Sequence, residues 1–304
     1  MKLYIIGNGF DLHHRLPTST NDFIKFIEIE DIDENYVVSG VNWSEYENAL
    51  SYFDVDEMCE QFVGYPDYLS DRESDRDGVI FEMQQKTATM QVSLNNALNK
   101  MISTTENMIE NNSVQIVNDK VFYNNSIILS FNYTSTIESL YDLNNNSILH
   151  IHGYYSDREK LVFGYSQPDK SVLDIFESRF VSIPGRKDPF KHPQSEDAEV
   201  DYPDYYVQQQ YDEMYNYYIS NQKHVRLEEL SNWIEPYIKD INEIIVLGHS
   251  MGAVDKPYFE LLEQKINPPR WIISQYGDSP HIDYLSSYSF SNKISFCTID
   301  DYIS

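Results

Sequence analysis

The hydrophobic pattern of the chain alternates between short apolar runs and longer segments with helical periodicity. Several short runs are apolar at consecutive positions, which is typical of strands buried on both faces of a parallel sheet. We expect three of them, Leu3–Ile6, Ser126–Phe131 and Glu243–Leu247, to be adjacent in the middle of that sheet. The full set of expected strands is Leu3–Ile6, Ser126–Phe131, Ile148–His152, Leu161–Phe163, Glu243–Leu247, Trp271–Ser274 and Ile294–Thr298.

Two insertions with helical character separate the expected strands. The first covers about residues 18–118, where Ser44–Glu47 begins a helix with acidic residues in its first turn and Phe81–Ile109 repeats apolar residues at helical spacing. The second covers about residues 170–236 and is polar, acidic and rich in tyrosine. The expected fold is α/β: a single domain over residues 1–304, with a Rossmann-like parallel sheet and two largely helical insertions.

The second insertion has an unusual composition. We interpret its tyrosines, which lie between Tyr202 and Tyr218, as a helix face that packs through its rings; an interaction surface is the alternative. Prolines between Ser182 and Pro203 predict a loop there.

The composition limits the classes of function. The formal net charge is −27, from 49 acidic and 22 basic residues, so the chain should repel polyanions and not bind DNA or RNA non-specifically. No run reaches the roughly 18 to 20 apolar residues of a membrane helix, and the first residues lack the pattern of a secretion signal, so we expect a cytoplasmic protein. Cys59 and Cys297 are the only cysteines, which excludes a disulfide framework and a Cys-x-x-Cys zinc site. No metal is expected.

Four polar segments follow predicted strands, at the positions where open α/β sheets bind ligands. They are Gly7–Asp11, Ser130–Thr134, His150–Gly153 and Gly248–Gly252. The two glycines of the first segment would allow backbone amides to point at a phosphate; a turn that needs glycine for steric reasons alone is the alternative. Leu12 stands where the dinucleotide fingerprint has its third glycine, so an ordinary Rossmann dehydrogenase is a poor match.

The second and third segments contain the candidate catalytic residues. Asn132 has a neutral amide that can hold a water or a ribose hydroxyl, although asparagine at this kind of position is also a common turn former. His150 and His152 are two residues apart and would share a strand face, with His150 within the sheet and His152 at its end. His152 is the candidate general base; a hydrogen-bonded core histidine is the alternative.

The fourth segment fits the Gly-x-Ser-x-Gly nucleophile elbow of α/β hydrolases, with Ser250 as the nucleophile. Little sequence remains after Ser250 for the rest of such a fold, and His281 is the only downstream histidine. The acids available for a triad are Asp255, Glu260, Glu263 and Asp278. A glycine-flanked turn whose serine is a ligand or a cap is the alternative.

Taken together, the four segments resemble the NAD-binding fold of the sirtuins. Gly7–Asp11 is similar to the sirtuin Gly-Ala-Gly-x-Ser, and Leu16-Pro17 falls at the spacing of the Ile-Pro that follows it. Asn132 matches the asparagine of the sirtuin Gln-Asn motif, and His152-Gly153 matches the catalytic His-Gly. Gly248–Met251 is close to the sirtuin Gly-Thr-Ser-Leu.

Longer stretches of the chain look like the AbiH family of bacterial abortive-infection proteins. These stretches are Ile5–Leu12, Leu16–Ser19, Trp43–Glu47, Ser130–Thr134, His150–Gly153, Gly248–Met251 and Val254–Phe259. The region of residues 170–240 contains no motif that we can place.

The two resemblances imply a role in defence against phage, NAD as ligand or substrate, and a set of site residues. Asn132 and His152 would be catalytic, and the implied NAD-binding residues are Gly7, Asn8, Gly9, Phe10, Asp11, Arg15, Gly248, Ser250 and Asp255. Amides of the Gly7–Phe10 loop would hold the pyrophosphate, and Arg15 would add a positive charge. Asp255 would either bond a ribose hydroxyl or cap a helix that begins near Lys256.

The chain also departs from the sirtuin pattern. It cannot build the four-cysteine zinc module, and Asp11, Arg15 and Phe131 replace a serine, a glycine and a glutamine. Protein deacetylation is therefore not expected, whereas hydrolysis of NAD needs only the nucleotide pocket and a water.

The leading expectation is an abortive-infection effector that binds NAD and hydrolyses its nicotinamide–ribose bond. A nucleotide-sensing module without turnover and a serine hydrolase are the alternatives. The expected partner is a small nucleotide, with no membrane, and the sequence leaves a homo-oligomer or a phage-derived trigger open.

Overall fold

The computed structural model describes residues 1–27, 40–111, 122, 125–141, 143, 147–157, 161–179, 204–266, 270–275 and 285–303. At its centre is a six-stranded sheet with the order β3-β2-β1-β4-β5-β6. All neighbouring strands are parallel. The strands are β1 (Lys2–Ile6), β2 (Ser126–Ser130), β3 (Ile148–His150), β4 (Glu243–Leu247), β5 (Trp271–Ser274) and β6 (Ile294–Cys297). This is the order of a doubly wound, Rossmann-like fold, and it confirms that the first, second and fourth strands are adjacent.

The continuous apolar runs arise because both faces of the sheet are covered. On β1, Leu3 and Ile5 pack into one hydrophobic cluster, and Tyr4 and Ile6 pack into another on the opposite face. Helices α9 (Leu227–Ile234) and α10 (Lys256–Lys265) contribute to the first cluster. Helices α1 (Asn8–His13), α6 (Thr136–Tyr141) and α12 (Asp300–Ile303) contribute to the second.

The predicted strand at Leu161–Phe163 is wrong. The amide of Val162 donates to the carbonyl of His152 at 2.8 Å, but the segment joins no strand of the sheet. It is apolar because it packs against aromatic side chains of the first insertion, with the ring of Phe163 stacked 6.3 Å from that of Tyr46. The run Ile148–His152 is likewise a strand only as far as His150.

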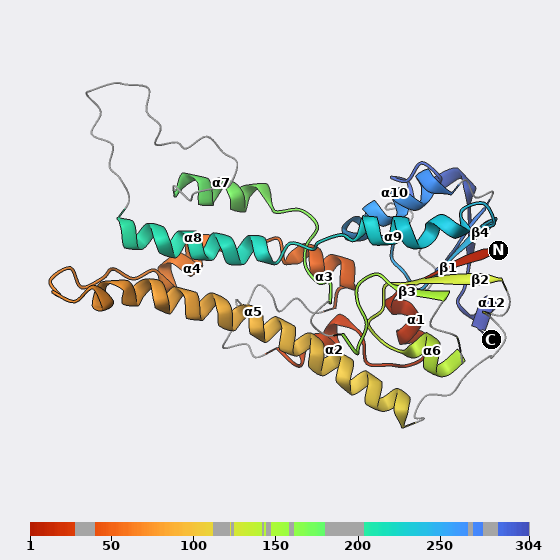
Figure 1. Cartoon of the computed structure of the whole chain (residues 1–304), viewed down its shortest axis with the longest axis horizontal. Coiled ribbons are helices and arrows are strands. Elements are labelled where there is room, and N and C mark those ends of the chain that lie inside the picture. Colours follow the sequence, from red (N-terminus) through yellow and green to blue (C-terminus); the bar gives the residue numbers. More distant parts are fainter. Residues whose placement is uncertain are drawn as a thin grey trace, which may run out of the picture.

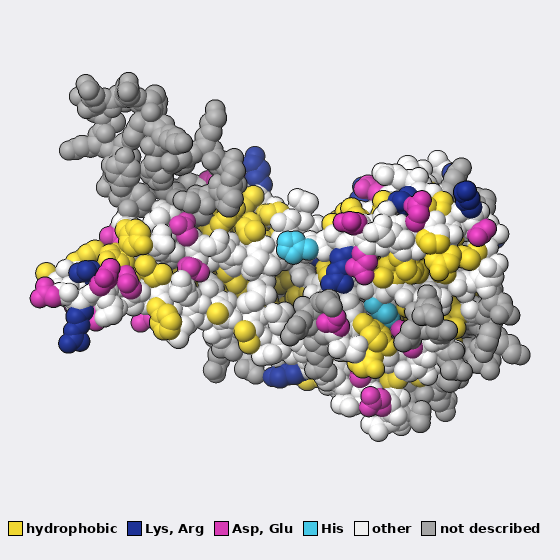
Figure 2. Space-filling model, in the orientation of Figure 1, with side chains coloured by type: hydrophobic (Ala, Val, Ile, Leu, Met, Phe, Trp, Pro, Cys, Tyr) yellow, Lys and Arg dark blue, Asp and Glu magenta, His cyan; other side chains and the backbone are white. Residues whose placement is uncertain are grey.

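The first insertion begins with three short helices, α2 (Thr20–Ile24), α3 (Trp43–Ala49) and α4 (Val55–Phe62), and continues into the long helix α5 (Glu73–Glu110). Helix α5 extends far from the sheet, so the molecule consists of an α/β body and an elongated helical arm (Figure 1). The connection between α4 and α5 at the far end of the arm exposes Tyr65, Tyr68 and Leu69, and hydrophobic side chains are visible on that surface (Figure 2).

The second insertion adds α7 (Lys170–Ser178) and α8 (Tyr205–Ser220) to the arm, and α8 lies alongside α5 (Figure 1). Tyr215, Tyr217 and Tyr218 of α8 are buried in the hydrophobic cluster of the arm, as the packing interpretation predicts, whereas Tyr205 is exposed. The predicted loop at Ser182–Pro203 lies outside the described residues. A single-residue parallel bridge between Tyr165 and Gln222 follows α8 and brings the chain back toward the sheet.

Candidate functional site

The first turn of α1, directly after β1, is in backbone contact with the loop after β4 at the centre of the sheet edge. The amide of Gly9 donates to the carbonyl of Gly248 at 2.7 Å. A Cβ on Gly9 would lie 2.8 Å from the Cα of Gly248, and a Cβ on Gly248 would lie 2.2 Å from the amide nitrogen of Phe10. Gly248 also has φ of +68°, which favours glycine. In a doubly wound sheet, this point between β1 and β4 is the switch point at which ligands bind.

Close packing therefore accounts for the glycines of the first loop in this structure. The amides of Gly7, Gly9 and Phe10 donate to the carbonyls of Leu247, Gly248 and Gly7, at 3.0, 2.7 and 2.9 Å. The expected phosphate cradle at Gly7–Phe10 thus has three of its amides engaged within the protein. The ring of Phe10 is fully buried beside His14 and Tyr141, and Asn8 is partly exposed at the start of α1.

Asp11 joins the loop after β1 to the loop after β2. Its carboxylate accepts a hydrogen bond from the hydroxyl of Thr134 at 2.7 Å, and its other oxygen, Oδ1, is buried without a partner. Burial raises the pKa of Asp11 to about 6, although the hydrogen bond from Thr134 opposes the shift.

Asn132 and His152 follow the neighbouring strands β2 and β3. The amide of Ile151 donates to the carbonyl of Ser130 at 2.9 Å, so the two residues continue the register of the sheet just beyond the strands. Both are about 95% buried, and both have a buried polar atom without a hydrogen-bond partner, Nδ2 of Asn132 and Nε2 of His152. The ring of His150 contacts the carbonyl of Asn132 at 2.9 Å and the carboxylate of Glu138 at 2.7 Å, so it supports Asn132 from within the body.

His152 belongs to a buried cluster of ionisable side chains. We call it the Asp255 cluster, and its members are Glu47, His152, Lys223, His249 and Asp255. The ammonium of Lys223 lies 3.0 Å from both oxygens of Glu47 and 3.0 Å from Oδ1 of Asp255. Nε2 of His152 lies 3.1 Å from the same Oδ1, although its N–H is not directed at the oxygen. Nε2 of His249 lies 3.3 Å from Oδ2. The side chain of Lys223 has no exposed surface.

The hydrogen bonds assign a tautomer to His249. Its Nδ1 accepts the amide of Met251 at 2.8 Å, so in the neutral ring the proton is on Nε2 and faces Asp255. The Asp255 carboxylate therefore faces two imidazoles and one ammonium. It does not cap α10, because it makes no side-chain hydrogen bond to that helix start.

Burial and charge set the protonation states of the Asp255 cluster. Burial, and then the ammonium of Lys223, lower the pKa of His152 to about 4 against the opposing effect of Asp255. Burial alone would raise the pKa of Asp255, but Lys223 and His152 hold it well below its usual value. Burial raises the pKa of Glu47 to about 7, with Lys223 opposing the shift and Asp255 adding to it. His152 is therefore neutral at pH 7 and Asp255 is ionised.

Two predicted ligand residues, Arg15 and Ser250, make no hydrogen bond or ion pair with the described residues of the Asp255 cluster. Arg15 is exposed at the end of α1 with φ of +61°, and its guanidinium makes no ion pair within the described part of the chain. The hydroxyl of Ser250 makes no hydrogen bond to a described residue, and His281, the histidine that a serine hydrolase would need, lies outside the described residues.

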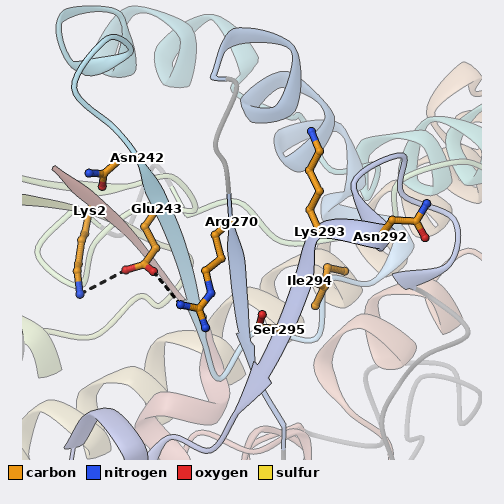
Figure 3. Close-up of a pocket in the computed structure, with 8 residues that line it drawn as sticks. All are labelled: Lys2, Asn242, Glu243, Arg270, Asn292, Lys293, Ile294 and Ser295. Carbon is orange, nitrogen blue, oxygen red and sulfur yellow. Dashed lines mark ion pairs between the residues drawn. The ribbon is translucent and has the colours of Figure 1, made fainter.

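The opposite edge of the sheet has different chemistry. An open depression of about 690 Å³ lies at the amino ends of β1, β4, β5 and β6 (Figure 3). There, Lys2 and Arg270 both pair with Glu243, at 3.3 and 3.8 Å. Because the polar loops gather at the carboxyl edge, this depression is separate from the candidate site.

Comparison with known proteins gives one match. The family model described as bacteriophage abortive infection AbiH matches residues 3–275, which include β1 to β5 and both insertions. The chain belongs to the AbiH family. It is thus a member of a family named for abortive infection by phage. No curated protein and no solved structure gives a significant match.

The Asp255 cluster contains three residues that sequence reasoning did not select. His249 lies inside the predicted fourth segment, and Glu47 lies inside a stretch that resembles the AbiH family. Both could therefore have been selected as site candidates from the sequence. Lys223 lies in the region without a recognised motif. Within the described ranges, no group of three or more histidine, cysteine or acidic side chains could hold a metal ion. Among the described helices, none is both long and apolar enough to span a bilayer.

Proposed function

We propose that this AbiH-family chain binds NAD at the carboxyl edge of β1, β2 and β3 and hydrolyses its nicotinamide–ribose bond. The observation that carries the proposal is a pair of buried polar atoms without hydrogen-bond partners among the described residues, Oδ1 of Asp11 and Nδ2 of Asn132. They follow the adjacent strands β1 and β2 beside the switch point, and His152 follows the next strand, β3. Buried polar groups are almost always hydrogen-bonded, so two exceptions at one sheet edge favour a ligand with hydroxyl groups.

The residue roles follow from the chemistry of the donors. The carboxylate of Asp11 can accept from a ribose hydroxyl, and the amide of Asn132 can hold a hydroxyl or the attacking water. His152 is neutral at pH 7, and its Nδ1 has no hydrogen-bond partner among the described residues. Because Nε2 faces the Asp255 carboxylate at 3.1 Å, Nδ1 of His152 is the atom that would accept a proton.

The proposed hydrolysis needs only NAD and water as reactants. Water adds its oxygen to the anomeric carbon of the ribose, the bond to nicotinamide breaks, and nicotinamide leaves with the bonding electrons as a neutral molecule. His152 takes the proton that the water loses and later releases it to solvent. Water loses its proton more easily to a base that is oriented by a carboxylate, and Asp255 supplies that carboxylate.

The structural support for the proposal comes from residues that would contact the nicotinamide–ribose end of NAD. The amides of Gly7, Gly9 and Phe10 already have acceptors, so this conformation gives less support for the pyrophosphate end. We also propose that the protein acts in the cytoplasm, where its substrate is found.

One observation favours binding without turnover as the second candidate function. A base is most effective when its pKa is near the working pH, and the pKa of His152 is lowered to about 4. The same site would then bind the nucleotide and signal to a partner.

The deciding experiment measures NAD loss and nicotinamide release by chromatography, with purified chain in the presence and absence of lysate from phage-infected bacteria. Binding of NAD is measured by calorimetry in parallel. Nicotinamide release at the rate of NAD loss is the expected result. Binding without release would assign the sensing function, and neither binding nor release would reject both.

A further inference from the structure

The Asp255 cluster is assembled from three distant parts of the chain. Glu47 lies on α3 of the first insertion, Lys223 follows α8 of the second insertion, and Asp255 follows β4 in the body. The three charged side chains are nonetheless 3.0 Å apart, Lys223 bridging both carboxylates. Each insertion therefore contributes one charge to a cluster that reaches His152.

We propose that Lys223 and Glu47 are positioning residues of the candidate site: they fix Asp255 where it faces both His152 and His249, so the site is complete only when both insertions are docked on the sheet. This inference rests on the function proposed above.

Stability alone is a weak explanation for a buried ion network. Removing charges from water costs several kcal/mol per ion, and hydrophobic replacements of buried pairs are often neutral or stabilising. Lys223 has no exposed side-chain surface, and its pair Glu47 is 6% exposed. A network that carries this cost, beside an imidazole whose Nδ1 has no hydrogen-bond partner among the described residues, favours a role in the site.

The backbone around Lys223 is held firmly enough to position its side chain. The amide of Lys223 donates to the carbonyl of Tyr165 at 2.7 Å, and the amide of Tyr165 donates to the carbonyl of Asn221 at 3.3 Å. The buried ring of Tyr165 stacks 5.2 Å from that of Tyr218. On the other side, the hydroxyl of Ser44 on α3 lies where a Cβ on Gly252 would be, so α3 packs directly on the loop before Asp255.

Asp255 depends on this support. Its side chain makes no cap hydrogen bond to α10, and its contacts within the described residues are those with Lys223, His152 and His249. Lys223 and His152 meet the same oxygen, Oδ1. Loss of the ammonium would leave Asp255 free to turn and would remove a positive charge that faces His152.

The test compares Lys223→Met and Glu47→Gln in the full chain. One readout is nicotinamide release from NAD; the other is the ring titration of His152 by NMR, which needs no turnover. Groups that face His152 and must be considered in its titration are Lys223, Asp255, His249, Tyr133 and Tyr258.

The two variants are expected to differ in the titration of His152. Lys223→Met removes the repulsive ammonium, so protonation of His152 should move to higher pH. Glu47, with a pKa raised to about 7, is already protonated where His152 titrates, so Glu47→Gln should leave that titration near the wild type. Both should reduce nicotinamide release by on the order of 10- to 100-fold, the scale of a small misplacement in an active site.

Gln210→Met is the matched control. Gln210 is fully buried on α8, and its side chain bonds the backbone of Gly64 at 2.9 Å in both directions. It joins the two insertions as Lys223 does, but away from Asp255. This variant should be less stable and should keep the wild-type titration of His152.

The proposal is overturned if Lys223→Met folds and both readouts match the wild type. If Lys223→Met does not fold, the isosteric Glu47→Gln decides, and wild-type nicotinamide release in that variant rejects the proposal. If the wild type releases no nicotinamide, the proposed function fails, while the shift in His152 still tests the positioning.

Discussion

Gly9 and Gly248 touch through their backbones at the point where the two central loops of the sheet meet. Neither residue has space for a Cβ, since the nearest backbone atoms would be 2.8 and 2.2 Å away. The contact fixes the loop after β1 against the loop after β4, and through Gly7–Asp11 it also fixes the position of Asp11. The integrity of the switch point therefore depends on two glycines that are distant in the sequence.

Gly248→Ala is expected to lower the free energy of unfolding by about 2–3 kcal/mol or more, because it adds a steric clash to the strain of positive φ. Gly40→Ala is the control, since Gly40 also has positive φ, +79°, but has nothing within 4 Å of its added Cβ. That variant should lose only about 1 kcal/mol. Urea unfolding of both variants measures the difference, and equal losses would show that the contact contributes nothing.

Asn132→Ala and His152→Ala are each expected to reduce NAD cleavage by about 10²- to 10⁴-fold, the usual effect of losing a positioned acid–base group. Secondary structure by circular dichroism should be unchanged. His13→Ala is the control, because His13 is a histidine of α1 that pairs with Asp300 outside the site. Wild-type rates in both site variants would refute the roles given to Asn132 and His152.

The sheet could be predicted because its signal is local. Each strand of β1, β2 and β4 is buried on both faces, so the run itself is apolar whatever the rest of the chain does. The same apolar pattern gave a wrong strand prediction at Leu161–Phe163. That segment packs against an aromatic cluster of the arm and not within a sheet. An apolar pattern indicates that a segment is buried, but only the tertiary structure shows which elements bury it.

The candidate site could be predicted only in part, for the same reason. Asn132 and His152 directly follow apolar runs, and a strand end is visible in the sequence. Glu47 fits the acidic first turn of an exposed helix, yet the docking of α3 buries it against Lys223. Lys223 is a single lysine in a polar segment, and its meeting with Asp255 depends on how the second insertion folds back.

Asp11 is expected to make stability depend on pH between about 4 and 6. Its pKa in the folded chain is raised from 3.8 to about 6, so the folded state binds the proton more tightly than the unfolded state. As pH rises through this window the unfolded state ionises first, and the free energy of unfolding falls by on the order of 3 kcal/mol. Asp11→Asn cannot ionise and should lose this slope. The measurement is the difference between the urea unfolding curves of wild type and Asp11→Asn at each pH; a difference that stays constant from pH 4 to 8 would exclude the raised pKa.

Arg15→Gly is expected to stabilise the chain by about 0.5–1 kcal/mol. Arg15 has φ of +61°, a conformation that costs an L-residue roughly 1–2 kcal/mol and glycine almost nothing, less what glycine loses in backbone entropy. Thermal unfolding measures the gain, and Arg15→Ala, which retains the strain, should show none. NAD affinity measured on the same two variants separates backbone from charge: if the guanidinium attracts the ligand, both variants bind NAD more weakly by a similar factor, whereas wild-type affinity in both leaves Arg15 with no part in the site.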